Sequence, residues 1–508
     1  MAFALVACTS PRDAPGPEAS TVTPAKGISD AEIGQKFSDV RARLGEPTTA
    51  GSNRLVFARY PDRSIELVFA SSEPARLTDD SRVVAVSVGR GASCKGVPCP
   101  GQSKREIESA FGLPEDTAER IAYYARGVSV VYGPDDVATQ VSAYASYRPE
   151  STPAEMTPAP ASANVERRAV DSAKIGVVDM HLHPGFFGRI PSATKAIFVG
   201  AIPAFARPYA PGVSGAALSP YDSLLGIRDQ TTWAGVDHAV LFAVYTQKTT
   251  GFFTNEDLLR VLESPENVAS DGLPWAFGLA SVNLFDGYVR DDGTVDEEKA
   301  GKRLAAMASY FERRPDLFLG IKLAHPHQQI ALDDRRYSGV YDVARKFGVP
   351  VYLHTGFSPF PSAKNEPKSY DPENIEEVVK AYPDVTFVLG HVGQGDPRAV
   401  EHALGLAKKY VNVYLEISAL GRPFLVDEEG KAIAPNPEKP QLPYVIAEIK
   451  KRDLVEKTLF GSDGPQFSGM VKGYVESVRS RMTESGYRPE EIAKVFGGTF
   501  AKVYLRAR

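Results

Sequence analysis

Residues 176–184 read Gly-Val-Val-Asp-Met-His-Leu-His-Pro, the most informative stretch of this sequence. Its apolar, β-branched start predicts a buried parallel strand, which the proline ends. Side chains alternate along a strand, so Asp179, His181 and His183 leave on one face. Two imidazoles at that spacing, at the C-terminal end of a strand, can bind one metal ion together. A His-x-His pair alone is common in soluble proteins, so other residues must supply the remaining ligands.

Further strand-like runs follow and alternate with helical stretches. Most are rich in Val, Ile, Leu and Phe and are bounded by Gly, Pro, Asn or Asp, as strands buried on both faces are. The alternation over residues 173–508 predicts an α/β fold, a (β/α)8 TIM barrel. Its chief insertion is an aromatic- and proline-rich loop at 184–230, whose residues 205–209 either form a lid or pack against the barrel. We expect strands at 177–183, 238–245, 275–283, 318–323, 349–355, 385–391, 411–418 and 458–463, and helices among others at 256–262, 297–312 and 376–382.

The predicted strands end in residues that bind metals or transfer protons. Barrel enzymes place their chemistry at the C-terminal ends of strands. Four of the eight histidines stand at such ends, which chance explains poorly. The residues at these ends are His181, His183, Lys322, His354, His391, Glu416 and Asp463.

Four motifs contain most of these residues: Asp-x-His-x-His, Leu-His-Thr-Gly, Gly-His-Val-Gly and Phe-Gly-Ser-Asp. Their order closely resembles that of the amidohydrolase superfamily, specifically its "amidohydrolase 2" branch of metal-dependent hydrolases and non-oxidative decarboxylases. The resemblance extends over essentially all of residues 173–508. It implies a metal-dependent enzyme that acts on a small molecule.

The same resemblance implies a divalent metal ion, Zn²⁺ before others, held by His181, His183, His354 and Asp463. Neutral imidazoles suit such ions. Asp463 is expected both to coordinate the metal and to take a proton from its bound water. The alternative for Asp463 is a turn residue that precedes Gly-Pro.

His391 and Lys322 bear on the number of metal ions. The histidine at the position of His391 is an unligated acid or base in relatives with one ion, and it binds the second ion in binuclear relatives. Lys322 stands where some binuclear relatives carry a carboxylated lysine that bridges two metals. Its alternative is an unmodified lysine that pairs with Asp463 or a substrate anion. We expect one ion, following the closer branch of the family, with two ions as the alternative.

Other polar residues are expected to support this site. Asp179 orients a neighbouring ligand or bonds the backbone. Glu416 either supports the ligands or forms a buried ion pair with Lys322 or an arginine. Arg422 and Arg189 are candidates for binding a substrate carboxylate.

The remaining histidines receive lesser roles. His325 and His327 follow the fourth strand and are expected at the cavity wall or the surface. His238 begins the second strand, at the wrong end for catalysis, and His402 lies in a helical stretch, so neither is assigned a function.

The leading functional hypothesis is hydrolysis, in which a metal-activated water attacks an ester, lactone or amide carbonyl. Asp463 manages the proton, and His391 or the metal polarises the carbonyl oxygen. The alternative is non-oxidative decarboxylation of an aromatic or unsaturated acid at the same metal, with His391 as proton donor. A third reading is an envelope binding protein whose barrel is inactive.

A duplicated unit occupies residues 29–147, before the barrel. Residues 34–47 match residues 101–114, each a short helix that ends in Gly-x-Pro. The pattern resembles BamE-like lipoprotein domains of bacterial envelopes, so we expect two small α+β units that bind a partner or act as a spacer. Strands are expected at 55–60, 65–69, 83–88, 121–124, 128–132 and 137–144.

The N-terminus predicts a location outside the cytoplasm. Leu-Val-Ala-Cys8 resembles a lipobox, in which Cys8 is lipidated after cleavage of a signal peptide; the apolar segment before it is short, so we expect a longer natural N-terminus. Residues 1–28 then form a tether, and the Pro/Ala/Thr-rich residues 148–172 form a linker. Cys94 and Cys99 are expected to pair, as in an oxidising compartment. The prediction is a lipoprotein of the bacterial cell envelope that faces the periplasm or the surface.

Composition excludes other classes of protein. At 508 residues the chain is long enough for two or three domains, and it is 43% hydrophobic and 24% charged. The net charge of −5, without a long basic run, argues against a nucleic-acid partner. The sequence contains no run of about 18 apolar residues, the length that would predict a membrane-spanning helix.

Overall fold

The structure, a computed structural model, consists of two compact units. One unit comprises Met1–Tyr147 and Val199–Ala216, and the other comprises Arg148–Phe198 and Ala217–Arg508. The predicted lipidation site Cys8 lies outside the described residues. The structure describes residues 20–24, 26–52, 55–71, 76–124, 127–144, 155–160, 175–191, 193–195, 204–210, 223–285, 288–290, 292–427, 429–431, 438–464 and 470–505.

The first unit is built on one antiparallel eight-stranded sheet with the strand order β4-β5-β6-β7-β12-β11-β10-β9. Each repeat contributes a helix and four consecutive strands, and the two repeats join where their last strands, β7 and β12, pair antiparallel with Val88 opposite Val141. The repeats thus share one sheet, whereas the sequence predicted a separate small sheet for each. The elements are α1 (Phe37–Leu44), β4 (Thr48–Ser52), β5 (Leu55–Tyr60), β6 (Ile65–Ala70) and β7 (Arg82–Gly89), then α2 (Lys104–Phe111), β9 (Asp116–Ala118), β10 (Ile121–Tyr124), β11 (Val128–Tyr132) and β12 (Ala138–Tyr144).

Both faces of this sheet are covered. Helix α1 lies on one face, where Phe37 contacts Phe69 edge-on with ring centroids 5.5 Å apart, and Ile107 of α2 is buried in the same core. On the other face, Tyr209 packs with Phe57 and Tyr144. The sheet therefore has two apolar layers, one on each side.

Tyr209 belongs to the short helical segment η4 (Ala204–Tyr209), which lies far along the sequence from the sheet. Its hydroxyl donates to Glu66 and accepts from Gln140, and the Tyr123 hydroxyl donates to the carbonyl of Arg207 at 2.9 Å. The aromatic segment 205–209 was expected to cover the barrel or pack against it. That expectation was wrong for Tyr209, which is 1% exposed in the core of the first unit.

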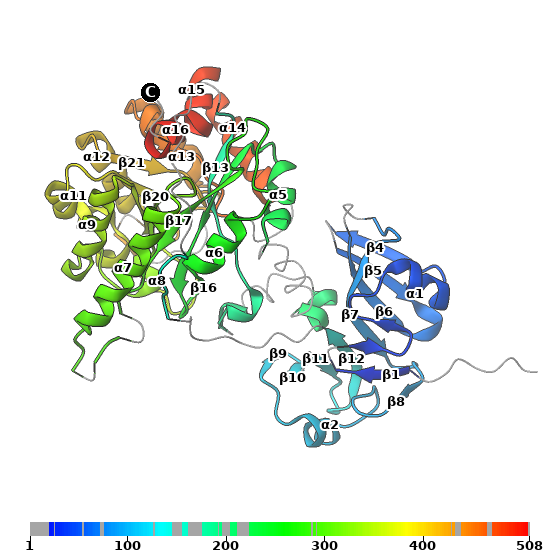
Figure 1. The fold of residues 1–508 in the computed structure, drawn as a ribbon. Helices are drawn as coiled ribbons and strands as arrows, with labels where there is room; N and C mark the ends of the chain where they lie inside the picture. Colours follow the sequence, from blue (N-terminus) through cyan, green and yellow to red (C-terminus); the bar gives the residue numbers. More distant parts are fainter. Residues whose placement is uncertain are drawn as a thin grey trace, which may run out of the picture. The chain divides into compact units, whose positions relative to one another are not determined.

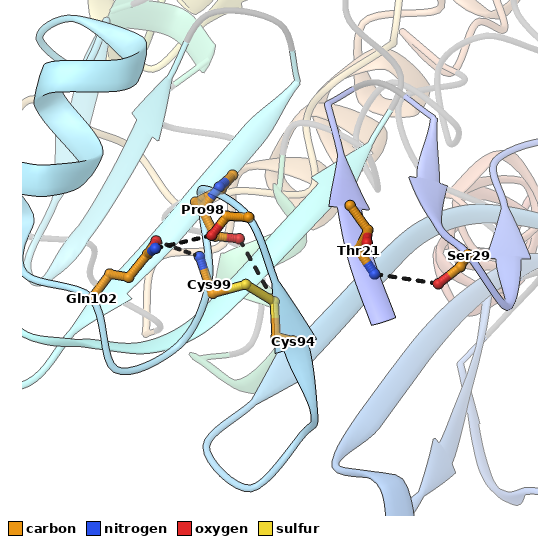
Figure 2. The surroundings of a disulfide bond; sticks show 7 residues. Thr21, Ser29, Cys94, Pro98, Cys99 and Gln102 are labelled. Carbon is orange, nitrogen blue, oxygen red and sulfur yellow. Dashed lines mark hydrogen bonds between the residues drawn. A yellow bond between two sulfur atoms is a disulfide. The ribbon is translucent and has the colours of Figure 1, made fainter. Parts of the chain in front are cut away.

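A small four-stranded sheet, with the order β3-β2-β1-β8, completes the first unit. Figure 2 shows the disulfide between Cys94 and Cys99 next to it. The Cys99 backbone N–H donates to the side chain of Gln102, which itself donates to the carbonyl of Gly96. The disulfide closes a short loop. The strands of the small sheet are β1 (Ser20–Thr23), β2 (Gly27–Ile28), β3 (Ala31–Glu32) and β8 (Cys94–Lys95).

The second unit is the predicted (β/α)8 barrel, with helices around its strands (Figure 1). All neighbouring strands are parallel, and a bridge between Leu182 and Gly464 joins the last strand region to the first. The strands, in sheet order, are β13 (Val178–Leu182), β14 (His238–Phe242), β17 (Ala276–Ser281), β18 (Phe318–Leu323), β19 (Val351–Gly356), β20 (Phe387–Gln394), β21 (Val413–Glu416) and β22 (Thr458–Leu459).

The helices of the barrel alternate with its strands as expected. Helix α6 begins with a capping box in which Thr254 and Asp257 satisfy each other's backbone N–H groups. Residues 155–160 of the predicted linker lie against α7, where the Ala159 N–H donates to Ser309. Among the described residues, no helix combines the length and the apolar character needed to cross a membrane. The main helices are α5 (Leu224–Thr232), α6 (Asn255–Leu262), α7 (Glu297–Arg313), α9 (Ser338–Phe347), α11 (Glu376–Ala381), α12 (Pro397–Lys409), α13 (Gln441–Lys451), α14 (Met470–Glu484), α15 (Pro489–Ala493) and α16 (Thr499–Tyr504).

Candidate metal centre

Three candidate ligand atoms meet at the C-terminal end of the barrel. Nε2 of His181 lies 2.9 Å from Nε2 of His183, and both atoms lie 3.2 Å from Oδ1 of Asp463. Backbone bonds between the first and last strand regions hold this arrangement: the Asp463 N–H donates to the His181 carbonyl, and the His183 N–H donates to the Gly464 carbonyl. Closure of the barrel therefore brings together residues from its two ends.

The chemistry of these three atoms fits a divalent cation. Each can offer a lone pair, and their separations of 2.9 to 3.2 Å are close to the spacing of about 3.3 Å between ligand atoms around a tetrahedral zinc ion with ~2.0 Å bonds. Nε2 of His354, a buried atom without a hydrogen-bond partner among the described residues, is a further lone pair in the same cavity. His181, His183 and Asp463 form one of the residue groups that could hold a metal ion.

Asp179 bonds the backbone and does not line the cavity. Its Oδ1 accepts the N–H groups of His181 at 3.1 Å and Ser462 at 2.9 Å. It thereby ties the strand that carries His181 to the segment that carries Asp463. Burial raises the pKa of Asp179 to about 7, although these hydrogen bonds act in the opposite direction.

Strained backbone accompanies the polar side chains. His391 and Asp463 both have left-handed backbone conformations, with φ of 63° and 62°. Such conformations are costly for residues with a Cβ and cluster at functional sites. Burial alone raises the pKa of Asp463, but the contact with His183 and the charges of His391 and Lys322 outweigh it and lower that pKa.

His391 lies next to His354, with its Nε2 3.0 Å from Nδ1 of that ring. On its other side, Nδ1 of His391 lies 2.8 Å from the Ser418 hydroxyl. Burial lowers the pKa of His391 to about 4, although Asp463 acts in the opposite direction. His391 is therefore within reach of the candidate metal site through His354.

A cavity of about 290 Å³ opens above these residues. Its polar floor is made by His183, Lys322, His354, His391 and Asp463. Its walls are mostly apolar, so a bound molecule would be shielded from water. The wall residues include Phe186, Ile190, Val244, Phe252, Phe357, Phe360, Leu425, Met470 and Tyr474.

Comparison with known proteins bears on this barrel. Residues 299–506 match the family model for amidohydrolases, a stretch that contains His354, His391 and Asp463. The matched part of the barrel, residues 299–506, belongs to the amidohydrolase family. The barrel is therefore that of an enzyme, from a family that generally uses divalent metals. No curated protein matches the sequence.

Solved structures similar to this chain have low sequence identity to it. An uncharacterised TIM-barrel protein from Bordetella bronchiseptica is 17% identical over 64% of this chain and 97% of its own, with a TM-score of 0.43. A 5-carboxyvanillate decarboxylase from Sphingomonas paucimobilis is 15% identical over 66% and 99%, with a TM-score of 0.39. A dihydroorotase from Campylobacter jejuni is 15% identical over 65% and 83%, with a TM-score of 0.38.

Lys322 of the amidohydrolase barrel is buried with no hydrogen-bond partner for its Nζ among the described residues. The ammonium lies over the rings of Tyr352 and Phe242, 4.1 Å and 4.6 Å from their centroids. Burial lowers the pKa of Lys322 to about 7, while Asp463 and Glu416 act in the opposite direction. Neither the predicted ion pair with Asp463 nor the one with Glu416 forms among the described residues.

Glu416 is bonded by hydroxyl groups. The Tyr352 hydroxyl donates to its Oε2 at 2.6 Å, and the Ser418 hydroxyl donates to the same atom at 2.9 Å. Burial raises the pKa of Glu416 to about 7, against the effect of both hydrogen bonds. Glu416 was expected either to support the metal ligands or to form a buried ion pair. The geometry fits the first of these two roles.

The two candidate arginines differ. Arg422 lines the cavity of the amidohydrolase barrel and is exposed. Arg189 does not line it, because its guanidinium pairs with Asp257 and lies over the rings of Phe186 and Phe252. The structure therefore leaves Arg422, and not Arg189, in a position to meet a substrate carboxylate.

The remaining histidines divide between the wall and the scaffold. His327 lines the cavity and bonds Thr249. His325 is fully buried beside Tyr337, so the expectation of a surface position was wrong for it. His238, at the N-terminal end of β14, forms a hydrogen bond with Asp271. His402 forms one with Asp371.

Sequence reasoning assigned no role to Tyr352 or to the group Asp371, Glu373 and His402. Tyr352 stands two residues before His354 in a strand, so alternation alone places both on one face. The group of three could also hold an ion, but two of its members are exposed or half-exposed and no spacing rule joins them.

Proposed function

We propose that the barrel is a metal-dependent hydrolase that acts on an ester, lactone or amide carbonyl of a small molecule. The observation that carries the proposal is the set of three candidate ligand atoms on His181, His183 and Asp463, the last two of which line the cavity. These residues, with His354, would hold one divalent ion, Zn²⁺ before others. Such an ion supplies a Lewis acid that polarises a carbonyl and makes water acidic near neutral pH.

The protein's own residues then divide the remaining tasks. Asp463 has a carboxylate beside both imidazoles and accepts the proton that the attacking water loses. His391 lines the same floor, and because both of its ring nitrogens have partners, Ser418 and His354, its task is to hold the His354 ring in place. The apolar walls exclude bulk water, which strengthens these interactions.

Lys322 and Arg422 favour a substrate with an anionic group. The buried ammonium of Lys322 has no hydrogen-bond partner among the described residues, and a carboxylate of the substrate would provide one. This feature also favours the second candidate, non-oxidative decarboxylation of an aromatic or unsaturated acid at the same site. The two reactions differ in the product and not in the residues that bind the substrate.

The test uses the full chain, purified and loaded with Zn²⁺, against two panels of compounds. One panel contains lactones, esters and amides with a carboxylate, and the other contains hydroxybenzoates and related acids. We expect ester or lactone hydrolysis that a chelator abolishes and added Zn²⁺ restores. Release of CO2 from the second panel without any hydrolysis would replace the first proposal by the second.

Variants separate an enzyme from an inactive binding protein. His181→Ala and Asp463→Asn are expected to lower activity at least a thousandfold and to reduce bound metal, because each removes a ligand. His238→Asn is the matched control, since its ring bonds Asp271 and the Pro274 carbonyl outside the cavity and belongs to none of the candidate metal groups among the described residues. If both ligand variants kept full metal content and activity, the proposed site would be wrong.

The envelope location and the lipid anchor at Cys8 remain predictions. Mass spectrometry of the native protein would find a diacylated or triacylated cysteine at that position if they hold.

A further inference from the structure

Glu416 is the common acceptor of a buried network behind the candidate metal site. Its side chain is 0% exposed, and four groups lie within hydrogen-bond distance of the same oxygen, Oε2. They are the hydroxyls of Tyr352 at 2.6 Å and Ser418 at 2.9 Å, the backbone N–H of His391 at 3.4 Å and Nδ1 of His181 at 3.3 Å. One carboxylate therefore bonds residues of other barrel strands and of the segment that follows its own strand.

Each hydroxyl in this network has a single proton and, when Glu416 is ionised, donates it in a hydrogen bond to that carboxylate. The lone pairs that remain face imidazoles: the Tyr352 oxygen lies 2.8 Å from Nδ1 of His181, and the Ser418 oxygen lies 2.8 Å from Nδ1 of His391. A hydroxyl whose proton is already donated can only accept. Both Nδ1 atoms must therefore carry hydrogen, and in the neutral rings, which burial favours, both Nε2 atoms carry a lone pair.

The same logic extends to a third ring. Nε2 of His391, a lone pair by this argument, lies 3.0 Å from Nδ1 of His354. His354 must then donate from Nδ1, which leaves a lone pair on its Nε2. That atom is buried and has no hydrogen-bond partner among the described residues. The arrangement thus presents unprotonated Nε2 atoms of His181 and His354, the form that binds a metal ion.

Two motif glycines make room for this network. A Cβ at Gly390 would lie 1.9 Å from the Tyr352 hydroxyl oxygen, and a Cβ at Gly461 would lie 2.2 Å from Oε1 of Glu416. No side chain fits at either position while the network is intact. The glycines of Gly-His-Val-Gly and Phe-Gly-Ser-Asp therefore have a physical reason that is separate from metal binding.

We propose that Glu416 is a positioning residue whose carboxylate, through Tyr352 and Ser418, sets the Nδ1-protonated form of His181, His391 and His354. The proton positions do not depend on a bound ion. Only the expected effect on metal binding rests on the metal site proposed above. The expected benefit is that the ligand atoms need no proton transfer before they bind a cation.

The experiment reads the proton positions directly. The full chain is labelled with 15N-histidine, and the ring nitrogens are observed by NMR in metal-free protein. The eight histidines give few enough signals to assign by single substitutions. We expect His181, His354 and His391 as neutral Nδ1-protonated rings. Neutral Nε2-protonated rings at these positions in the wild type would overturn the proposal.

Three variants divide the network. Ser418→Ala removes the acceptor of His391 and is expected to give mixed protonation of that ring. Tyr352→Phe removes the nearest acceptor of His181 and is expected to weaken Zn²⁺ binding about tenfold, measured by chelator competition, because Ser418 still lies 3.0 Å away. Glu416→Gln keeps the volume, loses the charge and is expected to alter both rings and weaken Zn²⁺ binding up to about a hundredfold.

Matched controls exist for the two hydroxyl variants. Tyr341→Phe and Ser369→Ala each remove a buried hydroxyl that has no hydrogen-bond partner among the described residues. Both are expected to leave the histidine spectra and the Zn²⁺ affinity unchanged. If Tyr352→Phe and Ser418→Ala behaved like these controls, the proposal would fail. A wild type that binds no Zn²⁺ but shows the expected spectrum would contradict the proposed function and support this inference.

Discussion

Both units of this protein contain an eight-stranded sheet, but their strands run differently. In the N-terminal sheet every pair is antiparallel, so successive strands end at opposite edges. In the barrel every pair is parallel, so all strands end at one edge. Polar side chains follow this difference. The barrel gathers histidines and carboxylates at that edge, whereas the first sheet is filled on both faces by apolar residues.

The comparison teaches that strand direction decides whether distant residues can form one site. His181 and Asp463 stand at opposite ends of the barrel sequence and still lie 3.2 Å apart. An antiparallel sheet of the same size has no edge where eight strand ends meet. The predictions below test how far the two sheets differ, in order of expected effect.

Phe69→Ala is expected to damage only the N-terminal sheet. Phe69 is fully buried against Phe37, and its truncation should lower the free energy of unfolding of that unit by about 4 kcal/mol. Hydrogen exchange of the full chain should show lost protection in peptides from residues 37–89 and unchanged protection in β18 and β19. Loss of protection in both units would show that they unfold together.

Gly461→Ala is expected to damage only the barrel site. The added Cβ would lie 2.2 Å from Glu416 and 2.7 Å from the Cβ of His181, so Zn²⁺ affinity should fall about a hundredfold. Gly112→Ala in the N-terminal unit is the control, since its Cβ would meet nothing within 4 Å. That control should cost about 1 kcal/mol through its positive φ and leave Zn²⁺ affinity unchanged. An unchanged affinity in Gly461→Ala would mean that the network tolerates a shift of Glu416.

The stability of the metal-free barrel is expected to rise with pH because of Lys322. Burial lowers its pKa to about 7 in the folded protein, whereas the unfolded lysine titrates near ~10.4, so the unfolded chain binds more protons in between. Between pH 7.5 and 9.5 the free energy of unfolding should rise by about 2 kcal/mol more in the wild type than in Lys322→Met. Urea denaturation at both pH values measures this difference. If the free energy of unfolding rose equally with pH in the two proteins, Lys322 would not titrate as an amine with a lowered pKa. Carboxylation of the lysine would give that result.

Tyr209→Phe is expected to have the smallest effect, on the N-terminal unit alone. The change removes the hydroxyl that bonds Glu66 and Gln140 and should cost about 1 kcal/mol. Tyr60→Phe is the control, because the Tyr60 hydroxyl is buried without a hydrogen-bond partner among the described residues. Thermal unfolding should distinguish the two variants, and equal melting temperatures would argue against a contribution from those bonds.

The sequence predicted the barrel well because the signals are local. Each strand is a short apolar run, and each catalytic candidate lies at the end of such a run in its own motif. The predicted strand 318–323 agrees with β18 at both ends. Asp179 was predicted to bond the backbone, and it does.

The features that the sequence did not predict depend on register between distant segments. Tyr352 reaches Glu416 only because β19, β20 and β21 align as they do, and no local pattern encodes that alignment. The pairing of β7 with β12, which merges two repeats into one sheet, is of the same kind. The residues around Tyr209 do not indicate that it packs on the N-terminal sheet. The residues around Lys322 likewise do not indicate that its Nζ has no hydrogen-bond partner among the described residues.

The segment η4 has a consequence for how the chain can be taken apart. Because Val199–Ala216 belongs to the N-terminal unit, the backbone passes between the two units three times: near residue 147, near residue 198 and near residue 216. A protease that cuts the 148–172 linker once would therefore sever one of three covalent ties. The two fragments would leave a gel-filtration column together under native conditions and separate only in denaturant, so a single nick would be invisible to any assay that does not unfold the protein.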